Sequence, residues 1–360
     1  MIPYLILIAP LFLFAFMDLT KDFHNRNIQM LLFFYYLIFL SLFAGLRYNT
    51  GFDYSSYERI FFSINNRSYF GESIEPGYIV LNQIILLLTG NYHVLLTIVT
   101  IITIVCISRF IWIYSPYKIY SLYLYVAIYF IGGVTGQMRQ AVAVSILTMA
   151  FQHVEKREFG KFLFWVLIAS LFHSTSFIFI IIYFIYPLNI NKVKMIAITT
   201  LSIILGYIDV IRFILPLLES FDTLFLVEDF IRYSESRHVG TSLFLNAGYL
   251  ERIFFIVLIF IFIDKILLKY QSSKVFIWSY MINSGIYFFF TEYQIFARRL
   301  SLPFKIVEII LIAMMISVIK NKYLKILVFF VFSIIYLSNL IATIQNPSGH
   351  YIPYEFLFNN

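Results

Sequence analysis

Residues 93–114 read HVLLTIVTIITIVCISRFIWIY, and this stretch decides the fold class. It contains a single charged side chain, Arg109, close to its end. An α-helix rises 1.5 Å per residue, so about 20 such residues cross the hydrocarbon core of a bilayer, which is about 30 Å thick. The stretch therefore predicts a membrane-spanning helix.

The composition of the chain supports the same interpretation. Of its 360 residues, 61% are hydrophobic and 12% are charged, whereas soluble domains carry about 25% charged residues. One core cannot bury so much apolar surface, so lipid must solvate much of it. We predict an all-α integral membrane protein with a single polytopic domain over residues 1–360. Further apolar runs predict spans at Ile2–Met17, Met30–Leu46, Ile119–Val134, Gln140–Val154, Val193–Val210, Ile253–Ile266, Val275–Phe290, Leu300–Ile319 and Ile326–Thr343.

Two stretches do not fit a simple span. The run 78–89 has only 12 residues, which suits a short re-entrant or interfacial helix near 77–90. The run 161–186 is interrupted by His-Ser-Thr-Ser at 173–176. It forms either one long span or two short ones that meet near His173.

The bias of basic residues toward cytoplasmic loops sets the orientation. It predicts about 12 transmembrane helices, both termini outside, and a large extracytoplasmic loop near 211–252. The first run has no basic region before it and no small-residue cleavage site, so we interpret it as a retained span and not as a signal peptide. Cys106 is the only cysteine and lies in an apolar run, which indicates a packing role and excludes an intramolecular disulfide.

The predicted topology places most lysines on one side of the membrane and most arginines on the other. Twelve of the thirteen lysines fall inside, with Lys305 as the exception. A guanidinium binds phosphate through two parallel hydrogen bonds and keeps its charge, so its enrichment outside indicates an anionic ligand. Alternatively, these arginines pair with outer carboxylates such as Asp53 and Glu75, or extend toward the lipid headgroups. Ten of the thirteen arginines fall outside: Arg47, Arg59, Arg67, Arg139, Arg212, Arg232, Arg237, Arg252, Arg298 and Arg299.

The first outer loop reads GLRYNTGFDYSSYERIF over residues 45–61. Arg47 and Asp53 flank Gly51, which permits a tight turn between them. Asp53, Tyr57 and Phe61 follow an i, i+4, i+8 spacing, which is typical of a packed helix face. A carboxylate beside the membrane surface nevertheless needs a partner or a chemical role, so Asp53 is a candidate functional residue.

Three further motifs carry polar residues into apolar surroundings. In EPGYIVLNQII, Glu75 and Pro76 predict the start of a helix at residue 76. In GQMRQAVAVSI, Arg139 and Gln140 stand at the outer mouth of a span, where an arginine and free helix N–H groups together form an anion site. In LFHSTSFI, His173 lies in a polar break, which membranes tolerate where the backbone is buried in protein or lines a watery cavity.

The four motifs, taken in order over residues 45–178, resemble the EpsG family, a branch of the Wzy-type O-antigen and exopolysaccharide polymerases. Arg47, Asp53, Arg139 and His173 occupy the positions of the family's polar motif residues. The resemblance implies a metal-independent glycosyltransferase of the bacterial inner membrane, with its active site facing the periplasm or cell exterior. The implied substrates are undecaprenyl-diphosphate-linked glycans, as both donor and acceptor.

The expected function is polymerisation of lipid-linked oligosaccharide repeat units into O-antigen, capsular polysaccharide or exopolysaccharide. Either Asp53 or His173 deprotonates the acceptor hydroxyl, and we favour Asp53. No cluster of metal ligands and no nucleotide loop occurs in the sequence, so we expect neither metal nor cofactor, and no nucleic acid. A chain-length regulator and a flippase are the expected protein partners. The expected diphosphate- and glycan-binding residues are Arg47, Tyr57, Glu75, Arg139, Gln140, Arg232, Arg298 and Arg299.

Three alternative functions stay open. An O-antigen ligase would use the same arginines and differ in its acceptor. A lipid-linked oligosaccharide flippase would need charges along a path through the bilayer, whereas here they collect on one face. A non-catalytic assembly partner would need no anion sites.

The orientation can be tested by cysteine labelling in a Cys106→Ala background. We expect a membrane-impermeant maleimide added outside to label single cysteines in 47–76, 135–139, 211–252 and 291–299. Labelling of a cysteine at position 156 from the outside would contradict this topology.

Overall fold

The computed structural model describes residues 1–20, 26–64, 74–213 and 242–359. The structure is about 82% helical, which confirms the all-α class. Contacts divide the chain into two compact units. The first comprises Met1–Met149, Leu167–His173 and Ile312–Asn360, and the second comprises Ala150–Val166 and Ser174–Leu311. A single polytopic domain stays a prediction.

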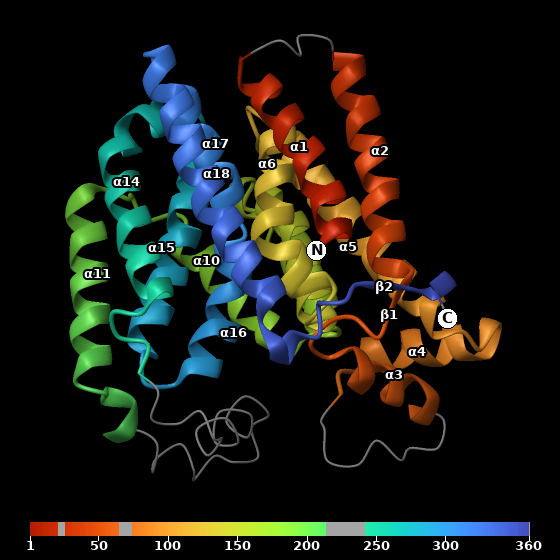
Figure 1. The fold of residues 1–360 in the computed structure, drawn as a ribbon. Coiled ribbons are helices and arrows are strands. Elements are labelled where there is room, and N and C mark those ends of the chain that lie inside the picture. Colours follow the sequence, from red (N-terminus) through yellow and green to blue (C-terminus); the bar gives the residue numbers. More distant parts are fainter. Residues whose placement is uncertain (21–25, 65–73, 214–241, 360) are drawn as a thin grey trace. The chain divides into compact units, whose positions relative to one another are not determined.

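The first unit consists of long helices side by side, with two shorter helices across one end (Figure 1). α2 packs on α5, α1 on α6, and α18 on the π-helix that continues α6. Its elements are α1 (Ile2–Thr20), α2 (Arg26–Gly45), β1 (Arg47–Tyr48), α3 (Tyr54–Ser63), α4 (Pro76–Thr89), α5 (Tyr92–Tyr114), α6 (Lys118–Tyr125), η2 (Val126–Val134), α7 (Met138–Leu147), α18 (Lys322–Gln345), η6 (Pro347–Gly349), β2 (Glu355–Phe356) and η7 (Leu357–Asn359).

Within the described residues, four helices are long and apolar enough to cross a membrane. This result confirms a membrane-embedded protein. Several other apolar runs form shorter helices, so the predicted number of about 12 crossings is not confirmed by helix length. The four long helices are Ile2–Thr20, Asn27–Gly45, Tyr92–Tyr114 and Lys322–Gln345.

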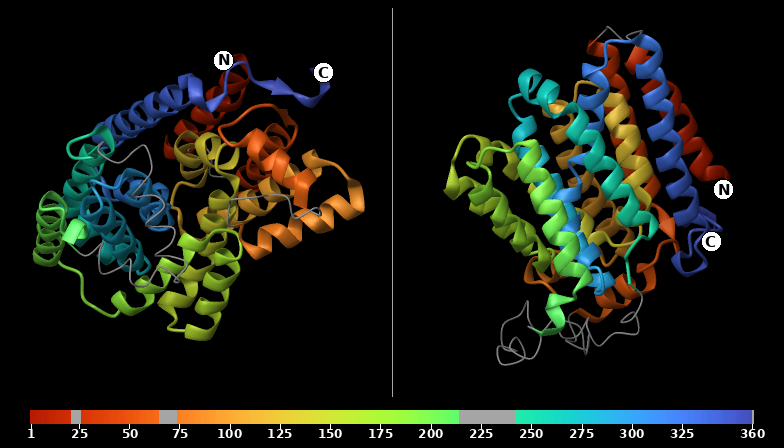
Figure 2. Two further views of the ribbon diagram at one scale, coloured as in Figure 1. Left: turned by 90° about the horizontal axis from the view of Figure 1, so that it is seen from below. Right: turned by 90° about the vertical axis from the view of Figure 1, so that its left-hand side faces the viewer.

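Helix α4 is the short helix predicted near 77–90. Its 14 residues rise about 21 Å, which is less than the thickness of the hydrocarbon core. It lies across the long helices of its unit, as Figures 1 and 2 show. As predicted, Glu75 precedes the helix and Pro76 is its first residue. The helix ends at Gly90, whose φ of 62° gives the left-handed cap that glycine favours.

Asparagine side chains begin four of the described α-helices. Each amide oxygen accepts a hydrogen bond from a backbone N–H in the first turn, which otherwise lacks a partner inside the helix. These caps explain why the predicted apolar runs become helices with sharp polar starts. They are Asn91 before α5, Asn191 before α11 (Lys192–Tyr207), Asn246 before α14 (Ala247–Lys269) and Asn321 before α18.

The C-terminal tail holds the loop that follows α2. β1 pairs antiparallel with β2, so that Arg47 lies opposite Phe356. Gly51 has a φ of 113°, as its predicted turn requires, and a Cβ there would lie 1.8 Å from the carbonyl oxygen of Thr135. The hydroxyl of Tyr4 donates to the carbonyl of Tyr351 at 2.8 Å. The loop, the turn before α7 and the tail therefore gather at one end of the first unit.

The second unit contains the remaining helices of the described chain, except that α9 and α17 continue into the first unit. Its elements are α8 (Phe151–Glu155), α9 (Phe159–Ser170), η4 (Ser174–Ile180), α10 (Ile181–Ile185), α11, α14, α15 (Ser273–Phe289), α16 (Gln294–Lys305) and α17 (Glu308–Val318).

The break predicted at His173 is confirmed. α9 ends at Ser170 and the next helix starts at Ser174. Arg157, just before α9, lies 3.8 Å from the ring of Tyr183 in α10 and accepts a hydrogen bond from its hydroxyl. The two arms therefore form a hairpin that the chain enters and leaves at the same end. α9 has 12 residues, and η4 and α10 have 7 and 5, so each arm is shorter than an ordinary span of about 20 residues.

The run 300–319, predicted as one continuous span, is instead broken. α16 and α17 meet at a bend of 51°. Pro303 lies inside α16 and cannot donate a backbone hydrogen bond, which weakens the helix at this point. The two helices together are long and apolar enough for one span, so the predicted span at 300–319 is bent and not continuous.

In each unit, taken separately, lysine-bearing loops gather at one end. In the first, Lys325 contacts the hydroxyl of Tyr117 at 3.2 Å. In the second, Lys192 pairs with Asp264 at 2.7 Å and Lys274 approaches the carbonyl of Pro187 at 3.5 Å. The separation of lysines from arginines between the two sides of the membrane stays a prediction.

We expect Asp18→Ala to destabilise the first unit. The Asp18 carboxylate accepts from the backbone N–H groups of Ile119 at 2.9 Å and Tyr120 at 3.3 Å, which begin α6. Losing the acceptor for buried donors costs about 1–3 kcal/mol. Thermal unfolding in detergent, followed by circular dichroism, should show a lower midpoint. Asp264→Ala removes an exposed ion pair and should change the midpoint little. Equal midpoints for the wild type and Asp18→Ala would refute the capping role.

Candidate functional site

A buried carboxylate connects three of the sequence motifs at one end of the first unit. Glu75 Oε2 lies 2.8 Å from Arg139 Nη1, and Glu75 Oε1 lies 2.9 Å from His173 Nδ1. The Glu75 side chain is only 6% exposed. The two oxygens of one carboxylate therefore bind an arginine and a histidine that are separated from it by 64 and 98 residues.

The start of α4 positions Glu75 against His173. The backbone N–H groups of Gly77 and Tyr78 donate to the carbonyl of Leu171, at 2.9 and 3.3 Å. These are first-turn donors with no partner inside α4, so the end of α9 satisfies them. A Cβ at Gly77 would lie 2.6 Å from the Cβ of Leu171, so only glycine allows this approach. His173 follows two residues later and is thereby fixed beside the carboxylate.

Two tyrosine rings surround the guanidinium of Arg139. Its central carbon lies 5.7 Å from the ring centre of Tyr57 and 5.9 Å from that of Tyr78. The two rings meet edge to face at 5.9 Å. Cation–π contacts of this kind strengthen when they are shielded from water. The Nε–H of Arg139 is buried and has no hydrogen-bond partner in the described structure.

The contact with Glu75 determines which nitrogen of His173 carries the proton. An ionised carboxylate only accepts hydrogen bonds, so Nδ1–H must donate to Glu75. The neutral ring then carries a lone pair on Nε2. Nε2 is buried and has no partner in the described structure. The arrangement therefore presents a proton acceptor, Nε2, on a ring that shares the Glu75 carboxylate with Arg139.

Electrostatics keep Glu75 ionised. Burial alone would raise the pKa of Glu75, but the hydrogen bond from His173 and the charge of Arg139 outweigh it and lower the pKa below its ordinary value of 4.5. Burial raises the pKa of the Tyr57 phenol, and the nearby charge of Arg139 opposes that increase. Tyr57 thus stays neutral.

Three other predicted residues lie in the same unit but outside this ionic cluster. Asp53 is half-buried at the start of α3, where its carboxylate interacts electrostatically with the phenols of Tyr57 and Tyr351. Arg47 is 1% exposed, and its Nε donates to the carbonyl of Thr50 at 3.1 Å. These contacts hold the loop turn. Gln140 is buried beside Arg139 in α7.

The remaining predicted residues lie elsewhere. Arg298 and Arg299 belong to α16 of the second unit, where Arg298 is exposed and Arg299 half-buried. Arg232 and most of the predicted loop 211–252 lie outside the described residues.

The sequence did not indicate three residues that hold this cluster together: Tyr78, Gly77 and Leu171. Tyr78 was one of 28 tyrosines, and nothing in its spacing distinguished it. Gly77 offered a usable signal, because glycine straight after a proline at a helix start indicates that another backbone approaches there. The carbonyl of Leu171 carries no sequence signal, because any residue supplies one.

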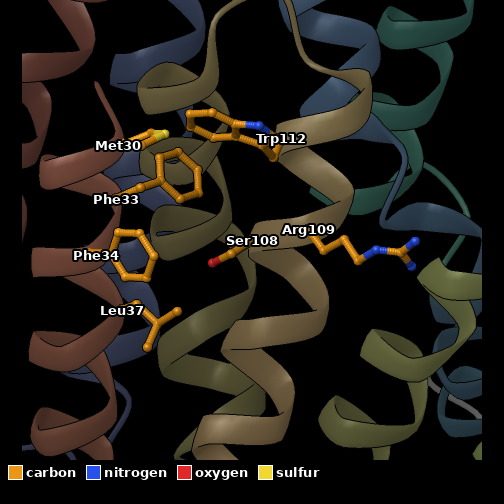
Figure 3. A pocket seen from close by; sticks show the side chains of 7 residues that line it. All are labelled: Met30, Phe33, Phe34, Leu37, Ser108, Arg109 and Trp112. Atoms are coloured by element: carbon orange, nitrogen blue, oxygen red, sulfur yellow. The ribbon is translucent and has the colours of Figure 1, made fainter. Parts of the chain in front are cut away.

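An apolar groove of about 300 Å³ lies between α2 and α5, near the opposite ends of these helices from the cluster (Figure 3). Phe33 and Trp112 line it. The side chain of Arg109 points away from the groove (Figure 3), and its Nη1 contacts Met149 Sδ at 3.0 Å. The groove is therefore lined mainly by uncharged side chains and contains no acidic residue. Among the described residues, no three metal-ligating side chains gather.

These features define the class of the chain: a polytopic α-helical membrane protein with a buried arginine–glutamate–histidine cluster at one end of its long helices. The sequence matches the EpsG family over residues 30–356. The chain therefore belongs to the EpsG family, which places it among membrane proteins of the polysaccharide polymerase type. Comparison with curated proteins and with solved structures finds no match to either.

The lowered pKa of Glu75 predicts how its contribution to stability depends on pH. A carboxylate whose pKa is lower in the folded state stabilises the protein above its unfolded value, and this stabilisation is lost as the pH falls through the folded value. Glu75→Gln should lower the free energy of unfolding at pH 7 by about 3–5 kcal/mol, the cost of breaking a buried pair. The difference from the wild type should shrink as the pH falls below 4.5.

Thermal unfolding in detergent at pH values between 7 and 3 measures this difference. Glu58→Gln, a half-buried carboxylate on α3, is the matched control and should show a small effect. A Glu75→Gln difference that stays constant or grows with acidification would contradict the assignment.

Proposed function

We propose that this protein polymerises undecaprenyl-diphosphate-linked oligosaccharide repeat units on the outer face of the bacterial inner membrane. The observation that carries the proposal is the buried contact of Glu75 with both Arg139 and His173. Ionisable groups within a membrane protein are costly and usually mark a functional site. Membership of the EpsG family supports a polymerase-type reaction.

The proposed reaction begins at the acceptor. His173 Nε2 takes the proton of the non-reducing-end hydroxyl, and the oxygen attacks the anomeric carbon of the donor sugar. The bond between that carbon and the diphosphate oxygen breaks, and the electron pair leaves with undecaprenyl diphosphate. Glu75 stabilises the imidazolium that forms, as a carboxylate does behind any histidine base.

Arginine charge is proposed to replace a metal ion at the leaving diphosphate. Arg139 keeps its Nε–H for a substrate oxygen, and its two tyrosine neighbours keep the guanidinium in place. Arg298 and Arg299 are further candidates from the second unit. Arg47 supports the site by holding the first outer loop and not by direct contact with substrate.

The structure changes our preference for the base. Asp53 is half-buried and lies next to Tyr57 and Tyr351, whereas His173 has a fixed tautomer and a free acceptor atom. We therefore favour His173, and we propose that Asp53 orients the acceptor sugar.

The finer topology also remains part of the proposal: about 12 crossings, both termini outside, and an outer loop near 211–252. A flippase and a chain-length regulator are proposed partners.

The function can be tested by reconstituting the purified protein with a synthetic undecaprenyl-diphosphate-linked repeat unit. We expect a ladder of products on a gel, formed equally well in EDTA and in magnesium. A single transfer without a ladder would indicate a ligase instead. Loss of the ladder in EDTA with rescue by one divalent ion would contradict the metal-independent mechanism.

His173→Gln should lower the polymerisation rate by about 10²–10⁴-fold, the usual contribution of a general base. Asp53→Asn should have a smaller effect that falls mainly on KM for the acceptor. His350→Asn changes an exposed histidine whose φ of 48° asparagine tolerates, and it serves as the control. Near-normal turnover of His173→Gln beside an inactive Asp53→Asn would reverse the two roles.

A further inference from the structure

A second group of buried charges connects four helices of the second unit. Lys305, the last residue of α16, lies 2.9 Å from Glu251 Oε1 in α14 and 3.6 Å from Glu308 Oε2 in α17. Glu308 is fully buried, and the Lys305 side chain is 12% exposed. Lys305 is also the one lysine that the topology did not place in a cytoplasmic loop.

Arg252 extends this group to α15. It is buried, its Nη1 donates to the carbonyl of Gly248 at 2.9 Å, and its Nη2 approaches the amide oxygen of Asn283 at 3.5 Å. Its guanidinium stacks 3.5 Å from the ring centre of Tyr287. Two cations and two carboxylates therefore balance one another across α14, α15, α16 and α17.

The group sits at the bend between α16 and α17. Lys305 ends one helix and Glu308 begins the other, so their ion pair bridges the break. The hydroxyl of Ser279 on α15 also donates to the carbonyl of Phe304, at 2.9 Å. Burying charges is expensive, and apolar residues of similar volume would often pack at least as stably. The network is therefore best explained by a need to fix one geometry of α16.

The geometry of α16 matters because of what the helix carries. Arg298 lies seven residues before Lys305, which is about two turns and nearly the same face of the helix. Fixing Lys305 thus fixes the direction in which Arg298 and its neighbour Arg299 point.

We propose that Lys305 is a positioning residue that holds α16 so that Arg298 and Arg299 reach the diphosphate of a lipid-linked sugar. This inference rests on the proposed function, which assigns those arginines to the diphosphate. Lys305 itself touches no substrate. It acts through its pairs with Glu251 and Glu308.

The test is a set of rates measured with the same lipid-linked repeat unit. Lys305→Met should lower the rate about 100-fold, because a displacement of about 1 Å at a substrate-positioning group can cost that much. Lys305→Arg keeps the cation and should restore most of the rate. Lys192→Met, which breaks an exposed ion pair of the same unit, should change the rate little.

The positioning role also predicts that the effects of Lys305→Met and of the arginine substitutions on the polymerisation rate do not multiply when they are combined. Once Arg298 and Arg299 are both alanine, adding Lys305→Met should cost nothing further, because residues that act as one unit are not additive. The proposal would be overturned if Lys305→Met lowered the rate by the same factor with and without the two arginines. It would also be overturned if the Lys305→Met variant had the wild-type rate. If Lys305→Met does not fold, Glu251→Gln keeps a hydrogen-bond acceptor for Lys305 and takes its place in the same comparison.

A second readout does not depend on activity. A cysteine at position 294, in a Cys106→Ala background, reports the accessibility of the start of α16. Its labelling rate by a maleimide should change with Lys305→Met and return to normal with Lys305→Arg. An unchanged rate would overturn the positioning role. A wild-type protein that makes no ladder, but whose labelling responds to Lys305→Met, would instead contradict the proposed function alone.

Discussion

The candidate site depends on one carboxylate that two other side chains share. Glu75 is buried, so its charge is tolerated only because Arg139 and His173 bind its two oxygens. Removing any of the three leaves an unpaired polar group in a place that water cannot easily reach. The same contacts give each partner its chemical state: an ionised carboxylate, a fixed guanidinium and a histidine with its lone pair on Nε2. Stability and proposed chemistry therefore rest on the same atoms.

Two short helices, α9 and α4, bring these groups together. α9 is too short to cross a bilayer, and its end supplies the carbonyl of Leu171 to the free N–H groups of α4. α4 is also too short and lies across the long helices of its unit. Membranes tolerate such broken helices only where their ends are satisfied within protein. Here each short helix satisfies the end of the other, which fixes His173 beside Glu75.

The sequence predicted the elements well and their pairing poorly. Apolar runs and helix-start residues are local signals, so the all-α class, the start at Pro76, the turn at Gly51 and a break near His173 could be predicted. The Glu75–His173 contact joins residues 98 positions apart, and no periodicity encodes it. The pairing of β1 with the C-terminal tail is more distant still. Arg47 shows a related limit, because its sequence motif could not reveal that the guanidinium is buried against backbone carbonyls.

The protonation site of the His173 imidazole can be measured directly. If Glu75 holds the ring as described, the proton lies on Nδ1. Nitrogen-15 chemical shifts from solid-state NMR of the protein in lipid bilayers distinguish the two neutral tautomers. The chain has six histidines, so the spectrum of His173→Gln identifies the signal of His173 by difference. The account predicts that the neutral ring carries its proton on Nδ1 and loses this preference in Glu75→Leu, which removes the acceptor. A proton on Nε2 in the wild type, or an unchanged signal in Glu75→Leu, would contradict it.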